Sequence, residues 1–159
     1  MFYLLMLLAV ILSGCSTPYQ TMGWSGGVDA ERMTTDTYRI VARGNGYTSS
    51  TTIQDYTVLK AAETTKQAGG THFMIVGAAD ASRTGTIVTP GQAQTTVSGN
   101  TAMTTYTPAQ AHSFIKPGQD TYIKVVNVLP GQAPPPGAIS ADEVIQFVGP
   151  RAKKPQFQL

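Results

Sequence analysis

The feature that most constrains the fold is a strand, helix and strand pattern within residues 37–79. Residues 37–43 alternate with a two-residue period, which predicts a strand with one buried face. Residues 52–68 have helical periodicity with a narrow, alanine-rich apolar face, and Gly69 follows as a stop signal. Residues 72–79 are almost continuously apolar, which predicts a strand buried on both faces in the middle of a sheet. If the two strands share one sheet, the helix is the crossover of a right-handed β-α-β unit.

The segment between the first strand and the helix, residues 44–50, is short and polar. Its composition predicts a tight turn, because it combines glycine with residues that tolerate left-handed backbone angles. If the turn has a structural role, we expect Gly44 or Gly46 to adopt a positive φ there. Thr51 is the predicted N-cap of the helix, and Gln54, three residues later, would complete a capping box.

The region that follows is rich in Thr, Gln, Ser and Gly, and only 13% of the chain is charged. Typical soluble domains are about one-quarter charged. Residues 94–98 and 101–106 flank Gly99-Asn100, which is the spacing of a two-residue hairpin turn. Because few of these residues are large and apolar, we expect the hairpin to be exposed or to lie at the edge of a sheet.

The C-terminal part of the chain predicts two more strands, at residues 113–115 and 121–129. Residues 130–137 contain four prolines and should form an extended surface connection. A capping box at Ser140 and Glu143 then predicts a short helix.

These patterns predict an α+β fold in a single domain. Its sheet would be mixed or mainly antiparallel, with one main helix in a β-α-β unit and a short C-terminal helix. We expect the domain to span residues 23–149. Pro150 should end the last helix, leaving a basic tail at residues 150–159.

The N-terminal segment has a different character. Residues 1–12 form an apolar run that ends three residues before Cys15, the only cysteine in the chain. A helix needs about 20 apolar residues to span a bilayer, so this run suits a signal peptide instead. No Lys or Arg precedes the run, which departs from the usual positive start of such a peptide. An ordinary signal peptide, or a buried helix that happens to hold a cysteine, is the alternative.

Leu12-Ser13-Gly14-Cys15 resembles the lipobox of bacterial lipoproteins. The resemblance implies that the Cys15 thiol is diacylglycerated and that the Gly14-Cys15 bond is cut. Residues 1–14 would then be a cleaved signal peptide and residues 15–22 a lipidated tether. By resemblance to enterobacterial sorting rules, Ser16 in place of Asp favours the periplasmic face of the outer membrane over the inner membrane.

A second resemblance covers most of the mature chain. Residues 38–76, with Gly23-Trp24-Ser25 before them and residues 141–145 after them, resemble a family of small uncharacterised proteobacterial lipoproteins. That family combines an RGNGYT turn with a D-Y-x-L-L-x-A-A-E helix and an F-x-I-V strand. Here Val58-Leu59 stands where two leucines are usual. The resemblance implies the same cellular location and the same fold, and the family has no assigned activity.

Charge and cysteine content exclude several classes of protein. The chain has eleven Lys and Arg residues against nine Asp and Glu residues, so it lacks the concentrated basic face that nucleic acid binding requires. With Cys15 lipidated, no thiol is left for an internal disulfide. His72 and His112 have no metal-ligand spacing, and we expect neither a metal site nor a cofactor.

One candidate binding site is the turn after the first strand, where backbone N–H groups at a helix start could bind an anion. A structural turn is the other interpretation, since the loop lacks the third glycine of a dinucleotide site and the lysine of a P-loop. The candidate residues are Arg43, Gly44, Asn45, Gly46, Tyr47 and Thr48.

A candidate nucleophile is Ser25, because residues 23–27 match the G-x-S-x-G pattern of hydrolases. That pattern works where a strand enters and a helix leaves, and neither is predicted here. The alternative is a glycine turn that folds Trp24 back onto the domain.

These observations predict a non-enzymatic, membrane-anchored lipoprotein that acts through protein contacts in envelope assembly, transport or sensing. Its contact surfaces would be the hairpin and the proline-rich connection, and its partner another envelope protein. A small-ligand or anion-binding module that uses the turn is the alternative, and a hydrolase that uses Ser25 is a remote one.

Overall fold

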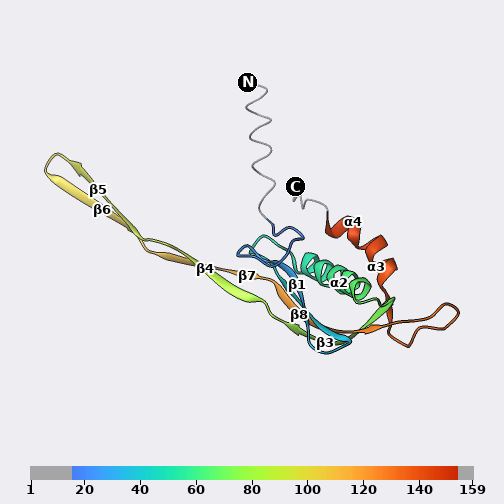
Figure 1. The fold of residues 1–159 in the computed structure, drawn as a ribbon. Helices are drawn as coiled ribbons and strands as arrows, with labels where there is room; N and C mark the ends of the chain where they lie inside the picture. Colours follow the sequence, from blue (N-terminus) through green and yellow to red (C-terminus); the bar gives the residue numbers. More distant parts are fainter. Residues whose placement is uncertain (1–15, 154–159) are drawn as a thin grey trace, which may run out of the picture.

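The computed structural model describes residues 16–153. A layered body and a long two-stranded arm are its two parts (Figure 1). The body contains one sheet, with helices against one of its faces. Its strands are β1 (Gly27–Arg32), β2 (Thr37–Arg43), β3 (His72–Asp80), β8 (Gly118–Val126) and β9 (Ile139–Ser140), and its helices are α2 (Ser50–Gln67), α3 (Ala141–Phe147) and α4 (Gly149–Ala152).

The sheet has the strand order β1-β2-β8-β3-β9, and every neighbouring pair is antiparallel. Because β2 and β3 are both antiparallel to β8, they are parallel to each other, and α2 connects them. The fold is therefore α+β, as predicted, with the expected strand, helix and strand in one sheet and β8 between the two strands.

The alternation of residues 37–43 matches the burial of β2. Ile40 and Ala42 are fully buried, whereas Arg39 and Arg43 are not. The covered face of the sheet and the apolar side of α2 enclose the core. Its largest side chains are Tyr56, Phe73, Ile40, Ile53, Leu59 and Ile123.

The helix α2 begins earlier than predicted. Ser49 is its N-cap, and the Ser49 hydroxyl accepts a hydrogen bond of 3.1 Å from the N–H of Thr52. The expected capping box of Thr51 and Gln54 is therefore wrong. Thr57 is buried although it is polar, because its hydroxyl donates to the carbonyl of Ile53 and is satisfied within the core.

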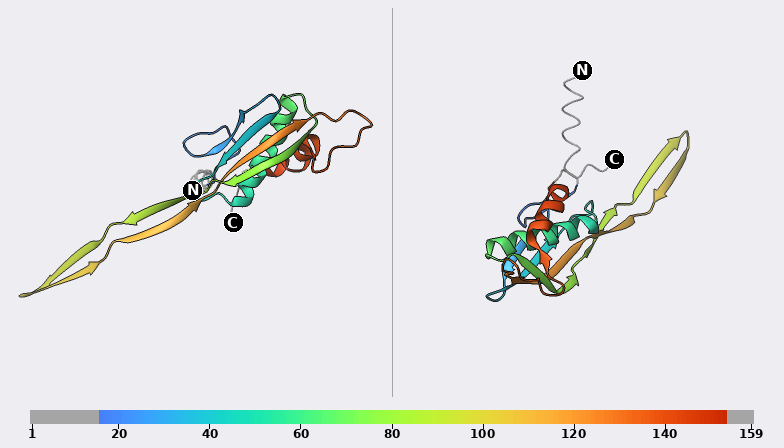
Figure 2. Two further views of the ribbon diagram at one scale, coloured as in Figure 1. Left: turned by 90° about the horizontal axis from the view of Figure 1, so that it is seen from below. Right: turned by 90° about the vertical axis from the view of Figure 1, so that its right-hand side faces the viewer.

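The strand β3 was predicted to be buried on both faces, and this is wrong. Phe73 is buried, but Ile75 and Val76 are exposed. The described helices lie on one face of the sheet only (Figure 2). Even on that face the cover is incomplete, because Ile75 lies opposite the buried Ile123 and is still 46% exposed, and the strand register shifts between Ile75 and Gly77. An apolar run therefore identified a strand correctly without determining what covers it.

The C-terminal part of the body confirms the predicted cap. The hydroxyl of Ser140 accepts the N–H of Glu143 at the start of α3. Pro150 does not end the helical region, since it lies in the first turn of α4, where its missing N–H costs nothing. Residues 150–153 are therefore packed on the body, and the predicted tail is wrong for them.

The arm continues the sheet away from the body (Figure 2). It consists of β4 (Arg83–Thr89), β5 (Gln92–Ser98), β6 (Thr101–Thr107) and β7 (Gln110–Lys116), with β4 paired to β7 and β5 to β6. Gly99 has a φ of 61° in the connecting turn, which confirms the predicted hairpin. Every residue of β5 and β6 is exposed, also as predicted.

Candidate functional site

The arm has an unusual surface chemistry. Residues 84–115 contain no Asp, Glu, Lys or Arg, and the charged residues Arg83 and Lys116 stand at its base. Soluble surfaces are ordinarily about a quarter to a third charged. This long exposed segment therefore lacks the charges that usually keep one molecule from adhering to another.

The register of the outer hairpin divides it into two faces, because residues opposite each other across two strands share a face. Tyr106 lies opposite Ala93, and Val97 opposite Ala102. Val97 is 69% exposed and Tyr106 is 68% exposed. This face of the arm is therefore the more apolar. The other carries Gln92, Gln94, Thr96, Ser98, Thr101, Met103, Thr105 and Thr107.

The edges of the arm are open as well. Within residues 16–153, each arm strand pairs with one other strand only, so a row of backbone N–H and C=O groups faces outward on each side. Natural proteins usually block such edges with charges, prolines or bulges. Pro90 and Pro108 interrupt the pairing halfway along the arm, between its two ladders. The arm therefore offers two short, neutral edges on each side.

The candidate turn holds the base of the arm. A Cβ on Gly46 would lie 2.5 Å from Cδ2 of Phe114, and one on Gly85 would also contact that ring. Neither Gly44 nor Gly46 has a positive φ, so that expectation is wrong. Gly46 is required because the aromatic ring of the arm packs directly against its Cα.

Most backbone donors of the same turn, residues 44–48, are used within the fold. The N–H of Gly44 donates to the carbonyl of Pro117, and the N–H of Asn45 donates to the hydroxyl of Thr17. The N–H of Tyr47 donates to the side-chain oxygen of Asn45 at 3.0 Å. These contacts support the structural interpretation of the turn over anion binding.

Arg43, the charge expected to assist anion binding, forms a salt bridge of 2.6 Å with Asp120. Its guanidinium also donates to the carbonyl of Gln119. The positive charge of Arg43 is therefore already balanced within the sheet.

Ser25 lies in a cleft of about 800 Å³ near the base of the arm. Its hydroxyl accepts a hydrogen bond of 3.1 Å from the side-chain amide of Gln20. No His, Asp or Glu is among the described residues that line the cleft, so none stands there to act as a general base. Trp24 does not fold back onto the domain as predicted, because it is 102% exposed.

Metal and membrane-spanning features are absent from the described part of the chain. Among residues 16–153, no group of His, Cys, Asp and Glu side chains could hold a metal ion. His72 contacts Thr71 at 2.9 Å, and His112 lies on the arm opposite Ile87. No described helix combines the length and apolar character needed to cross a membrane.

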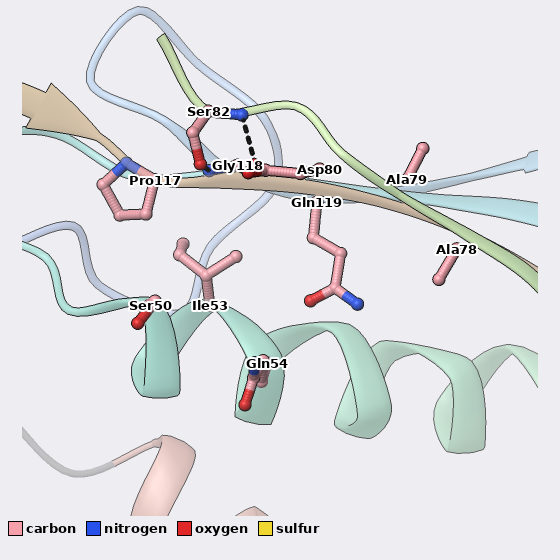
Figure 3. A pocket seen from close by; sticks show the side chains of 10 residues that line it. All are labelled: Ser50, Ile53, Gln54, Ala78, Ala79, Asp80, Ser82, Pro117, Gly118 and Gln119. Carbon is pink, nitrogen blue, oxygen red and sulfur yellow. Dashed lines mark hydrogen bonds between the residues drawn. The ribbon is translucent and has the colours of Figure 1, made fainter. Parts of the chain in front are cut away.

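A second hollow, which the sequence did not predict, has a volume of about 330 Å³ and lies between the start of α2 and the strands β3 and β8 (Figure 3). Gln119 and Ile53 point into it from opposite sides. Asp80 at its rim accepts the N–H of Ser82 at 2.8 Å, and hydrogen bonds from Ser82 lower the pKa of Asp80. With one carboxylate and few converging polar groups, the hollow does not define a ligand.

The predicted tether differs most from the structure. Thr17 is fully buried and makes four hydrogen bonds. Its N–H donates to the hydroxyl of Thr48, its own hydroxyl donates to the carbonyl of Ser25 and accepts the N–H of Asn45, and its carbonyl accepts the hydroxyl of Tyr56. The chain is therefore fixed to the body from Thr17 onward.

Tyr19 strengthens this attachment. Its ring packs edge-to-face on Tyr56 with centroids 5.3 Å apart, and its hydroxyl donates to Glu63 at 2.6 Å. Burial and the hydrogen bond to Glu63 raise the pKa of Tyr19. Lys153 completes the cluster with a salt bridge of 2.8 Å to Glu63. The first and last described segments thus meet on α2.

The predicted lipidation and cleavage residues, Cys15 and Gly14, lie outside the described residues. Their assignment stays a prediction.

Comparison with known proteins gave no match to a protein-family model, to a curated protein or to a solved structure. The family resemblance of residues 38–76 therefore stays a prediction.

Proposed function

We propose that this protein is a lipid-anchored protein of the bacterial envelope that acts without catalysis, through protein contacts made by its arm. The observation that carries the proposal is the exposure of residues 84–115. This uncharged segment projects from the body, and it has open strand edges and exposed apolar side chains. Exposed apolar patches and open strand edges are typical of sites that another polypeptide covers.

The chemistry of the arm indicates what kind of partner it suits. Its open edges can accept an extended strand, and its side chains supply apolar contacts from Val97 and Tyr106 without charges. Binding by strand addition depends on main-chain hydrogen bonds for affinity and on alternate side chains for specificity. The partner we propose is an envelope protein with an uncharged, extended segment.

The arm is tested by shortening it. Thr89 and Gln110 lie opposite each other, so a two-residue Asn-Gly turn can replace residues 90–109. We expect the shortened lipoprotein to keep the melting temperature of the body, whose core residues all lie outside the deletion. The shortened lipoprotein should no longer bind the envelope protein.

The partner is detected by placing a photo-crosslinking amino acid at Tyr106 in the intact lipoprotein within cells. The matched control carries it at Val76, which is also exposed but belongs to the body. We expect a discrete crosslinked protein from Tyr106 that is absent from Val76. Equal crosslinking from both positions would show that the arm is not the contact surface.

The anchor is tested separately. Replacing Cys15 by Ser should abolish fatty-acid labelling and leave an uncleaved precursor, and normal processing of this variant would contradict the lipoprotein assignment. Replacing Ser16 by Asp should move the protein from the outer to the inner membrane in a host that follows enterobacterial sorting rules.

A further inference from the structure

The distance between the proposed lipid anchor and the body is short. Thr17 is held by four hydrogen bonds, and Cys15 precedes it by two residues. An extended chain covers at most about 3.6 Å per residue, so the acylated residue can lie no more than about 7 Å from Thr17. A lipid attached at Cys15 would therefore bring the surface of the body around Thr17 directly to the membrane.

Two aromatic side chains stand on this surface. Trp24 is 102% exposed and Tyr47 is 67% exposed. Each is adjacent in sequence to a hydrogen-bond partner of Thr17, since Thr17 binds Ser25 and Thr48. Trp and Tyr are enriched at membrane interfaces, where an apolar ring and a polar tip meet both environments. An exposed tryptophan beside the anchor is placed to enter the headgroup region.

Positive charge lies beside Trp24. Arg83 and Lys116 line the same cleft as Trp24, and the described lining residues include no carboxylate. Neither forms a salt bridge with a described residue, although the Lys116 ammonium lies 5.5 Å from the Phe114 ring. They also lie directly opposite each other, an arrangement that is destabilising for like charges. A surface with negative charge would relieve this repulsion.

We propose that this face of the body, formed by Trp24, Tyr47, Arg83 and Lys116, docks on a bilayer with acidic headgroups. The proposal rests on the lipid anchor at Cys15. The ring of Trp24 enters the interface, and the two cations bind headgroup phosphates. Because the cations stand at the base of the arm, docking fixes the angle at which the arm leaves the membrane.

The intact, acylated protein allows a direct test, because Trp24 is its only tryptophan. The protein is reconstituted into vesicles of phosphatidylethanolamine and phosphatidylglycerol, with or without lipids brominated near the headgroup. We expect the brominated lipids to quench Trp24 fluorescence strongly, and aqueous acrylamide to quench it several-fold less than in the detergent-solubilised protein.

The matched control moves the tryptophan to the far end of the sheet. Leu129 is exposed and follows the end of β8 that lies away from the arm. In a Trp24→Phe, Leu129→Trp variant, acrylamide should quench the fluorescence and brominated lipids should not. Equal quenching of the two tryptophans by both agents would overturn the docking proposal. If labelling at Cys15 is normal in that case, the anchor stands and only the docking is wrong.

The charges are tested with a double variant, Arg83→Gln and Lys116→Gln. We expect it to lose the dependence of Trp24 quenching on phosphatidylglycerol and on salt, while its melting temperature stays the same or rises because the like-charge pair is gone. A Lys60→Gln, Lys124→Gln variant loses the same charge elsewhere and should keep the lipid dependence. The same loss in both variants would show that net charge, not this face, determines the interaction.

Discussion

The arm is a continuation of two neighbouring strands of the body, since β3 leads into β4 and β7 leads into β8. The two parts nevertheless bury very different amounts of surface. In the body, Ile40, Phe73 and Ile123 are fully buried between the sheet and α2. In the outer arm, no residue is buried. The comparison shows that strand pairing alone does not produce a core, because burial depends on what lies over the sheet.

The two parts should also differ in what stabilises them. Burial of apolar area stabilises the body. The arm depends on its hydrogen-bond ladder, the Gly99-Asn100 turn and cross-strand contacts such as that between the hydroxyls of Thr95 and Thr104. An isolated two-stranded hairpin is at best marginally stable in water. The arm is therefore the part of the molecule that a partner would stabilise most.

The largest difference is expected from truncating one aromatic side chain in each part. Phe73→Ala opens a cavity in the core and should lower the free energy of unfolding by about 3–5 kcal/mol. Tyr106→Ala on the arm should change it by less than about 0.5 kcal/mol. Urea unfolding of both variants measures the effect. Similar losses from the two substitutions would contradict the division into a packed body and an exposed arm.

A smaller effect is expected where the two parts meet. Gly46→Ala forces a methyl group against the ring of Phe114 and should cost about 1–3 kcal/mol. Gly77→Ala is the matched control, because its Cβ would lie at an ordinary contact distance of 3.7 Å from Tyr122. Thermal unfolding measures both. Combining Gly46→Ala with Phe114→Leu should recover part of the loss, and the absence of any recovery would contradict the proposed contact.

A further, smaller loss is expected at the N-terminal attachment. Thr17→Val keeps the shape but removes the hydroxyl that accepts the N–H of Asn45 and donates to the carbonyl of Ser25. The cost should be about 1 kcal/mol, near the lower limit for unsatisfied groups, because both partners are only partly buried. Thr21→Val, at an exposed position, is the control. No difference between the two variants in urea unfolding would restore the interpretation of this segment as a tether.

Local sequence signals predicted much of the fold. The alternation in residues 37–43, the Gly99-Asn100 hairpin and the Ser140 cap all depend on neighbours within a few residues, and all three are confirmed. The helix was predicted to start two residues too late. Ser49 and Thr51 can both act as an N-cap, and the structure uses Ser49.

Long-range contacts were not predictable in the same way. Nothing in residues 15–22 indicates that Thr17 hydrogen bonds to residues some thirty positions away, so the segment resembled a tether. The apolar run of β3 could not show that one face of the sheet is left open. For the arm, the composition predicted the exposure. The absence of charged residues from the whole of residues 84–115 becomes visible only when the entire stretch of sequence is considered together, and not one strand at a time.

The smallest predicted effect is a dependence of stability on pH that arises in the body and not in the arm. Burial opposes ionisation of Glu63, but hydrogen bonds from Lys153 and Tyr19 outweigh it and lower the pKa of Glu63 in the folded protein. A lowered carboxyl pKa stabilises the fold above the unfolded pKa of about 4.3, and this contribution is lost as pH falls through the folded value. Wild type should therefore lose its advantage over Glu63→Gln below about pH 4.3, as followed by melting temperature. The arm has no carboxylate in residues 84–115, so the shortened variant should show the same acid profile as wild type. A different acid profile would show that the arm contributes to the stability of the body.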